Sequence, residues 1–328
     1  MPIRSGIESL EASFRVADVG GAVKPIDAAQ YEAIRQRLDG GTAKGLVVLV
    51  HGYNNDRNAA VAAYEGFFAR QREIAQLVAE RALADNKIFS EVYWAGDADW
   101  GFVSFLCYMG AVGNARQTGV HFAELLARLA ERAEPLEVQL VGHSLGCRVV
   151  FEALRHLGAV ANLRVTHVVF MAAAVPLSLL EAPADQQRLR YSFDQVMRRS
   201  QGAARSLFSP DDIVLTGAFP AGQSLASGPE GFMPVALGRD FWQALIEPPR
   251  FTQHQVHGAN HSDYWGWNSK KLAQARDAQQ HVHQFLGFNS GGERPTSGRE
   301  PGSRDMEERE ETATRTTPTR PLPETWQP

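Results

Sequence analysis

The feature that most constrains the fold is the segment Leu136–Leu157, in which an apolar run meets a turn of small residues. The run Leu136-Glu-Val-Gln-Leu-Val is typical of a buried strand, and a helical composition follows the turn Gly142-His-Ser-Leu-Gly146. A strand that turns sharply into a helix holds the serine between them in a strained conformation, and the two glycines remove Cβ atoms that would collide with neighbouring backbone. Ser144 then projects beyond the sheet, in front of a helix N-terminus that favours developing negative charge.

This order of strand, Gly-x-Ser-x-Gly and helix resembles the nucleophile elbow of the α/β-hydrolase superfamily. The five-residue motif alone occurs often by chance, and the strand before it and the helix after it make the match specific. The resemblance extends over Gly45 to Phe288 and is strongest to a poorly characterised lipase/esterase-like group of bacterial serine hydrolases. It implies a mostly parallel, doubly wound α/β sheet with helices on both faces, and Ser144 as the nucleophile.

A second segment, the strand Leu46–Val50 followed by His51-Gly52-Tyr53, supports the same resemblance. In the superfamily the loop after this strand supplies one backbone N–H of the oxyanion hole, and the residue after the nucleophile supplies the other. By resemblance these donors are Tyr53 and Leu145. We interpret His51 as a structural histidine that tethers the loop, and Asn54, Asn55 and Asp56 as a turn and helix N-cap.

The superfamily's chain order places an acid after the serine and a histidine after the acid. Pro210-Asp211-Asp212 follows a strand that we expect at Ser206–Ser209. By resemblance the acid comes about three residues beyond the strand, which favours Asp212 as the triad acid, with Asp211 as the alternative. Turn and cap roles are a further interpretation of both residues, and we expect one of them to have such a role.

The general base is found by elimination among ten histidines. The loops above, the expected helices and one strand account for all but three, namely His254, His257 and His261. The first two fall within the strand expected at Phe251–His257. His261 lies in the loop before the last helix, where the superfamily carries its catalytic histidine, so it is the predicted base and His257 is the alternative.

The rest of the chain alternates strand and helix signals, which indicates parallel strands buried on both faces. We predict a lead-in at residues 1–44, with an antiparallel edge, a hairpin signal around Gly20-Gly21 and a helix near Ala28–Leu38. The catalytic domain follows at 45–288, and a Gly-, Pro- and Thr-rich tail at 289–328 is predicted to be disordered. Further strands are expected at Lys87–Trp94 and Val165–Met171, and further helices at Arg57–Leu83, Gln117–Glu134 and Ser269–Leu286.

Composition excludes several classes of function. Lys and Arg number 33 against 37 Asp and Glu, and this net charge of −4 argues against a nucleic-acid binder. Cys107 and Cys147 are too few for a disulfide scaffold and lack the paired spacing of a zinc site. We find neither a signal peptide nor a run of the roughly 18 apolar residues that a membrane span needs. We therefore expect a cytoplasmic protein, with export by a signal-independent route as an alternative.

Two apolar segments are expected near the site. Gly96–Gly113 has two interpretations, an acyl-pocket lining or lid and a buried core helix, and Gly217–Arg250 is a candidate cap. Trp265 and Trp267 are expected to anchor the loop that carries His261. Cys147 is expected to be a small buried residue.

The resemblance implies hydrolysis of a small-molecule or lipid ester through an acyl-enzyme, without metal or organic cofactor. The alternatives are a thioesterase, an amidase or an acyltransferase on the same triad, an exported phospholipase effector that damages membranes, and a catalytically silent binding protein. The sequence names no partner for the tail.

Overall fold

A computed structural model describes residues 3–4, 7–19, 21–41, 43–53, 55–75, 87–96, 104–177, 179, 195–226, 234–241, 250–266 and 271–288, of which 3–4, 7–8, 104–109, 223 and 225–226 are described by their backbone alone. These residues all lie in one compact unit, Met1–Gly291. The predicted tail at 289–328 lies outside the described residues, as do 76–86, the second half of the helix expected at Arg57–Leu83.

The described strands form one eight-stranded sheet in the order β1-β2-β4-β3-β5-β6-β7-β8. The strand pairs from β2 to β8 are all parallel, and β1 pairs antiparallel with β2 at the edge. This confirms the predicted fold class. The strands are β1 (Ile3–Arg4), β2 (Ile7–Ser13), β3 (Gly45–Val50), β4 (Lys87–Tyr93), β5 (Leu136–His143), β6 (Leu163–Met171), β7 (Ala203–Phe208) and β8 (Phe251–Gln255).

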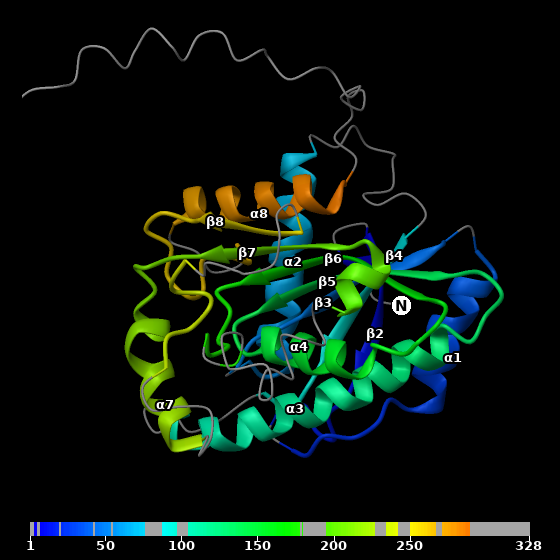
Figure 1. Cartoon of the computed structure of the whole chain (residues 1–328), viewed down its shortest axis with the longest axis horizontal. Coiled ribbons are helices and arrows are strands. Elements are labelled where there is room, and N and C mark those ends of the chain that lie inside the picture. Colours follow the sequence, from blue (N-terminus) through cyan, green and yellow to red (C-terminus); the bar gives the residue numbers. More distant parts are fainter. Residues whose placement is uncertain are drawn as a thin grey trace, which may run out of the picture. The chain divides into compact units, whose positions relative to one another are not determined.

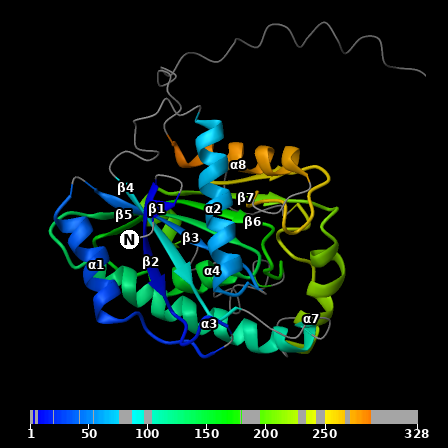
Figure 2. The ribbon, with the colours of Figure 1, turned by 180° about the vertical axis from the view of Figure 1, so that it is seen from behind.

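Helices cover both faces of the sheet (Figures 1 and 2). One face carries α2 and α8, which pack together, and the other carries α1, α3 and α4. Two further helices follow β7, a π-helix η2 and then α7, which contacts α3. The helices are α1 (Ala28–Asp39), α2 (Arg57–Ile74), α3 (Ser104–Leu129), α4 (Gly146–His156), η2 (Val214–Ala218), α7 (Phe219–Ala226) and α8 (Leu272–Leu286).

The core follows from the residue pattern of the central strands. Every residue of β3 is buried, as expected for a Val- and Leu-rich parallel strand covered on both faces. Phe151 of α4 stacks on Phe170 of β6 with ring centroids 4.5 Å apart, and on the other face Phe68 of α2 packs edge-on against Phe89 of β4 at 5.1 Å. Apolar side chains thus join the sheet to both helical layers.

The N-terminal segment differs in part from the expectation. The antiparallel edge is present only between β1 and β2, because β2 itself pairs in parallel with β4 and extends the main sheet. The hairpin signal corresponds to an antiparallel bridge between Arg15 and Val23. The predicted helix is α1, and the side chain of Asp27 caps it by accepting a hydrogen bond from Gln30 N at 2.8 Å.

Helix α3 begins earlier than predicted, at Ser104 rather than near Gln117. Gly110 and Gly113 lie within this helix, which tolerates them, and the space where a Cβ would lie is open at both. The second half of the expected insertion is therefore the first part of α3, while 97–103 lie outside the described residues. In the described part of the chain, no helix combines the length and apolar character that crossing a membrane requires.

Candidate active site

The site lies where the chain changes direction in the sheet. From β3 the chain moves to β4 on one side, and after β4 it crosses to β5 on the other side of β3. In open α/β sheets such a switch point creates a crevice at the carboxyl ends of the strands, where ligands bind. His51-Gly52-Tyr53 follows β3 and Ser144 follows β5, so the two predicted segments meet at this switch point.

Ser144 has a left-handed backbone conformation with φ of 53°, which is strained for a residue with a side chain. Three backbone hydrogen bonds hold the turn: Ser144 N donates to Met171 O, and Ser144 O accepts from Cys147 N and Ala174 N. Both glycines of the motif lie close to neighbouring backbone, and the contact is closest at Gly146. A Cβ on Gly146 would lie 2.2 Å from His51 O, and one on Gly142 would lie 3.1 Å from the Cα of Cys147.

The three residues predicted as a triad lie within hydrogen-bonding distance in the expected order. His261 Nε2 is 2.6 Å from Ser144 Oγ, and His261 Nδ1 is 2.8 Å from Asp212 Oδ2. Asp212 is fully buried, Ser144 is 4% exposed, and the His261 side chain is 19% exposed. The imidazole is therefore partly open to solvent, whereas the carboxylate is shielded from water.

The two adjacent acids have different contacts. Asp212 Oδ1 accepts hydrogen bonds from the backbone N–H groups of Val214 and Leu215, both at 3.0 Å, which leaves Oδ2 for His261. Asp211 is exposed, and its Oδ2 accepts from Gly258 N at 3.0 Å. Asp211 thus holds the backbone of the loop that carries His261, while Asp212 holds the imidazole itself.

His143 makes a contact with the predicted base that the sequence did not reveal. Its Nε2 donates to the backbone carbonyl of His261 at 2.8 Å, and the two rings lie 5.1 Å apart. Burial and, to a lesser extent, the nearby His261 lower the pKa of His143 to about 3, so His143 is neutral at pH 7. It occupies the variable position before the serine in the motif, where no spacing rule indicates a role.

Two observations concern the segments that carry the predicted oxyanion donors, Tyr53 and Leu145. A Cβ on Gly52 would lie 2.7 Å from the Cβ of Ser144, so the loop after β3 abuts the serine and Tyr53 is the next residue along it. Leu145 is the N-cap of α4, where the first backbone N–H groups of the helix have no partner within the helix itself. Both residues thus belong to segments next to Ser144.

Two other residues near the site, His51 and Trp265, are buried and hold the loops that carry it. His51 is fully buried, and its Nδ1 donates to Gly52 O at 2.9 Å while its Nε2 accepts from Trp94 N at 3.3 Å. Burial lowers the pKa of His51 to about 4, which keeps it neutral. Trp265 is buried edge-on against Tyr64 and anchors the loop, as expected.

The structure also describes three other residues for which the sequence predicted a role, Asp56, His257 and Cys147. Asp56 caps α2 by accepting from Ala59 N at 2.7 Å, whereas Asn54 and Trp267 lie outside the described residues. His257, the alternative base, is exposed and lies beyond the end of β8 at Gln255. Cys147 is buried, and burial raises the pKa of its thiol.

The candidate cap at Gly217–Arg250 is described only in part. It contains α7 and residues 234–241, while 227–233 and 242–249 lie outside the described residues. Among the described residues, one group of side chains has the composition of a metal site: His254 on β8 with Asp277 and His281 on α8.

Comparison with known proteins assigns the chain to a family. A family model described as "Alpha/beta hydrolase of unknown function (DUF900)" matches residues 26–216, a range that contains Ser144 and Asp212 and ends before His261. Comparison with curated proteins finds no match.

Solved structures with a similar chain course have low sequence identity to this protein. A protein described as a cell-surface hydrolase of Lactobacillus plantarum WCFS1 is 13% identical, with 75% of this chain and 92% of that chain covered and a TM-score of 0.41. A gene product of Listeria innocua is also 13% identical, covers 74% and 94%, and has a TM-score of 0.41. A lipase-esterase related protein from Clostridium acetobutylicum ATCC 824 is 9% identical, covers 74% and 95%, and has a TM-score of 0.35.

Proposed function

The chain belongs to the family of α/β-hydrolases of unknown function described above, and from this premise we propose that it is a serine hydrolase that cleaves carboxylic esters. The observation that carries the proposal is the unbroken line of contacts from Ser144 Oγ through His261 to Asp212, at 2.6 and 2.8 Å. A hydroxyl is un-ionised at neutral pH and needs an adjacent base to become a nucleophile. These contacts supply such a base and a buried group that orients it.

In the first half-reaction Ser144 Oγ attacks the ester carbonyl, and His261 Nε2 takes the hydroxyl proton. The tetrahedral intermediate collapses to an acyl-enzyme, and the alcohol leaves with the proton that His261 returns. Asp212 accepts the Nδ1–H of His261, which fixes the tautomer and stabilises the imidazolium. In the second half-reaction water attacks the acyl-enzyme by the same route and releases the acid and Ser144.

The proposed oxyanion donors are the backbone N–H groups of Tyr53 and Leu145. Donors of this kind contribute about 2.7–4 kcal/mol each to transition-state stabilisation. Gly52 supports this role for Tyr53, because the absence of a side chain lets the loop approach Ser144 closely. The N-terminus of α4 supports it for Leu145, because the helix dipole favours negative charge there.

Exposed apolar side chains near the acid support an ester with an apolar acyl part. Ile213 and Val214, directly after Asp212, are 71% and 38% exposed. Phe241 is 62% exposed and packs against Phe208 at the carboxyl end of β7, with ring centroids 6.3 Å apart. Each follows the end of a segment near the proposed acid, where it would suit an apolar acyl group.

The test is a panel of p-nitrophenyl esters of increasing acyl length, assayed with wild type and with Ser144→Ala. We expect hydrolysis by wild type and a loss of at least about 10⁴-fold in kcat for Ser144→Ala. His261→Ala should show a similar loss, while His257→Ala, an exposed histidine four residues earlier, should retain activity. Full activity in Ser144→Ala, or loss in His257→Ala with retention in His261→Ala, would contradict the mechanism.

A fluorophosphonate probe tests the serine independently of substrate choice, because it labels activated serines covalently. Labelling of wild type but not of Ser144→Ala is expected. Wild type that resists the probe would instead favour a binding protein. Labelling without ester turnover would direct the panel to thioesters, amides and phospholipids, which the same triad can cleave.

A further inference from the structure

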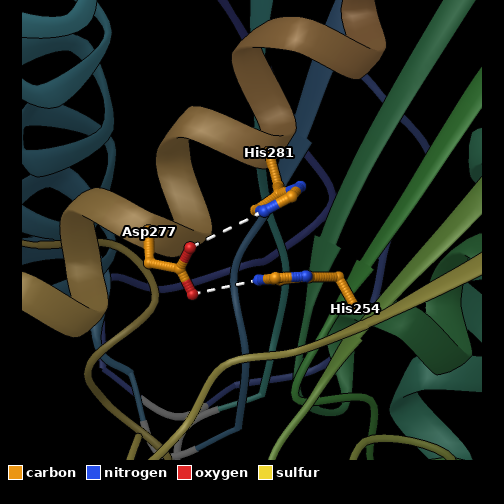
Figure 3. Close-up of side chains that lie close together, drawn as sticks. All are labelled: His254, Asp277 and His281. Carbon is orange, nitrogen blue, oxygen red and sulfur yellow. Dashed lines mark hydrogen bonds and ion pairs between the residues drawn. The ribbon is translucent and has the colours of Figure 1, made fainter. Parts of the chain in front are cut away.

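A second group of polar side chains lies away from the proposed triad, between β8 and α8. His254 extends from β8, and Asp277 and His281 extend from one face of α8, four residues apart (Figure 3). A spacing of four residues places two helical side chains beside each other on the same face. Figure 3 shows both imidazoles on the same side of the Asp277 carboxylate, with one carboxylate oxygen toward each ring.

The three side chains lie close enough together to bind one ion. His254 Nε2 lies 3.0 Å from Asp277 Oδ2, and His281 Nε2 lies 3.6 Å from Asp277 Oδ1. One ligand atom from each of the three residues can be chosen so that all lie within 4.8 Å of one another. Tetrahedral coordination at bond lengths near 2.0–2.1 Å separates neighbouring donors by about 3.3 Å, and the two imidazoles would rotate out of their stack to direct both Nε2 atoms at one ion.

The two imidazoles are stacked, with ring centroids 3.4 Å apart and an angle of 28° between the planes. Neutral imidazole is the form that binds metal, so affinity for an ion is expected to rise with pH. The side chains are 27–42% exposed, which lets an ion enter from solvent. The nearby Arg205 is held by other contacts, donating from Nε to the Thr252 hydroxyl at 3.1 Å and lying over the Phe285 ring.

We propose that His254, Asp277 and His281 form a binding site for one divalent transition-metal ion, with Zn²⁺ as the preferred occupant. Two imidazoles and one carboxylate are a donor set that zinc favours, whereas Mg²⁺ and Ca²⁺ prefer oxygen ligands alone. Water would complete the coordination.

The place of the site in the fold indicates a structural effect. The segment between His254 and Asp277 includes the loop that carries His261, so an ion would join the strand before that loop to the helix after it. Lys271 Nζ already donates to Gly258 O across the same loop. Bound zinc would add a cross-link to the folded state and stabilise it by mass action, independently of the proposed ester hydrolysis.

The experiment is a titration of the metal-free full-length chain with Zn²⁺ in competition with a chromophoric chelator. Wild type should bind one equivalent at this site, and His281→Ala and Asp277→Asn should each weaken binding at least tenfold. The control is His121→Ala, which removes a surface histidine 2.9 Å from Glu124 Oε2, a two-residue pair on α3. This variant should bind zinc as wild type does.

Two further measurements separate metal binding from misfolding. The melting temperature of wild type should rise by about 5 °C at a hundredfold excess of Zn²⁺ over Kd, and that of Asp277→Asn should not. Co²⁺ should give the intense visible absorption of a tetrahedral site in wild type alone. Equal zinc affinity in wild type, His281→Ala and Asp277→Asn would overturn the proposal, as would a wild-type chain that takes up no zinc.

Discussion

Replacement of Asp212 by Asn tests the proposed mechanism at the triad residue that is buried and hydrogen-bonded most completely. Asp212 is fully buried, and its Oδ1 accepts two backbone N–H groups at 3.0 Å. Asparagine keeps this oxygen and the side-chain shape, so the fold should persist. Its amide N–H₂ then faces His261 Nδ1, at the position where Oδ2 now lies 2.8 Å away. The imidazole must place its proton on Nε2, and it can no longer accept the proton of Ser144.

The expected effect is a fall in kcat of about 10⁴-fold with little change in KM, because the lost interaction acts in the transition state. At about 1.4 kcal/mol for each factor of ten, this corresponds to about 5.5 kcal/mol. The assay is steady-state hydrolysis of the best p-nitrophenyl ester of the panel, with the melting temperature measured on the same samples.

The adjacent acid supplies a matched control for this substitution. Asp211→Asn has the same chemistry one residue earlier, at an exposed side chain that contacts the backbone N–H of Gly258 rather than the imidazole. It should reduce kcat less than tenfold. If Asp211→Asn caused the large loss and Asp212→Asn did not, the assignment of the acid would be wrong. A comparable small loss in both would refute the role of the acid in orienting the base.

Three further predictions concern stability. The free energy of unfolding should fall by about 1.4 kcal/mol per pH unit for each of His51 and His143 as the pH drops from 6.5 towards 4. Their pKa values of about 4 and 3 lie below the unfolded value, so over this range only the unfolded chain takes up the protons. Urea unfolding at pH 7 and pH 5 measures this difference, and equal stability at the two pH values would refute it. Glu152→Gln should destabilise by at least about 1 kcal/mol in urea, because it removes the negative charge from an ion pair of 2.8 Å with Arg148 whose side chains are each 4% exposed; unchanged stability would contradict this. Gly146→Ala should destabilise by at least about 1–3 kcal/mol in urea, because its Cβ would meet His51 O at 2.2 Å, and unchanged stability would show that α4 can shift freely.

The elbow could be predicted from sequence because its constraints are local. The glycines, the serine, the flanking strand and the flanking helix all lie within a short stretch of chain. The contact that excludes a side chain at Gly146 comes from outside this stretch, from Val50 O and His51 O at the end of β3. The choice between Asp211 and Asp212 is different. Spacing places both beyond β7, and only the turn that follows Ser209 decides that the second carboxylate is buried and the first is exposed.

Contacts between distant segments account for what the sequence did not reveal. His143 meets the backbone of a residue 118 positions later, and this contact leaves no periodic signal. The parallel pairing of β2 with β4 likewise joins segments that are far apart in the chain. His254 fitted an alternating strand pattern, and its partners lie on the following helix. The four-residue spacing of Asp277 and His281 was visible in the sequence, but it indicates a shared face without naming what faces it.

The geometry of the site suggests that the position of the proposed base depends on more than its own side chain. Its loop is held through backbone groups, with Val256 N donating to Phe208 O at the end of β7 and Gly258 N donating to Asp211. His143 holds the carbonyl of His261 from the elbow itself. The strand that presents the acid and the turn that presents the serine are therefore the same elements that fix the loop of the base. Because displacement of a reacting group by about 1 Å can reduce rate 10²-fold, these shared anchors keep the three side chains in register when the loop or the helices around it move.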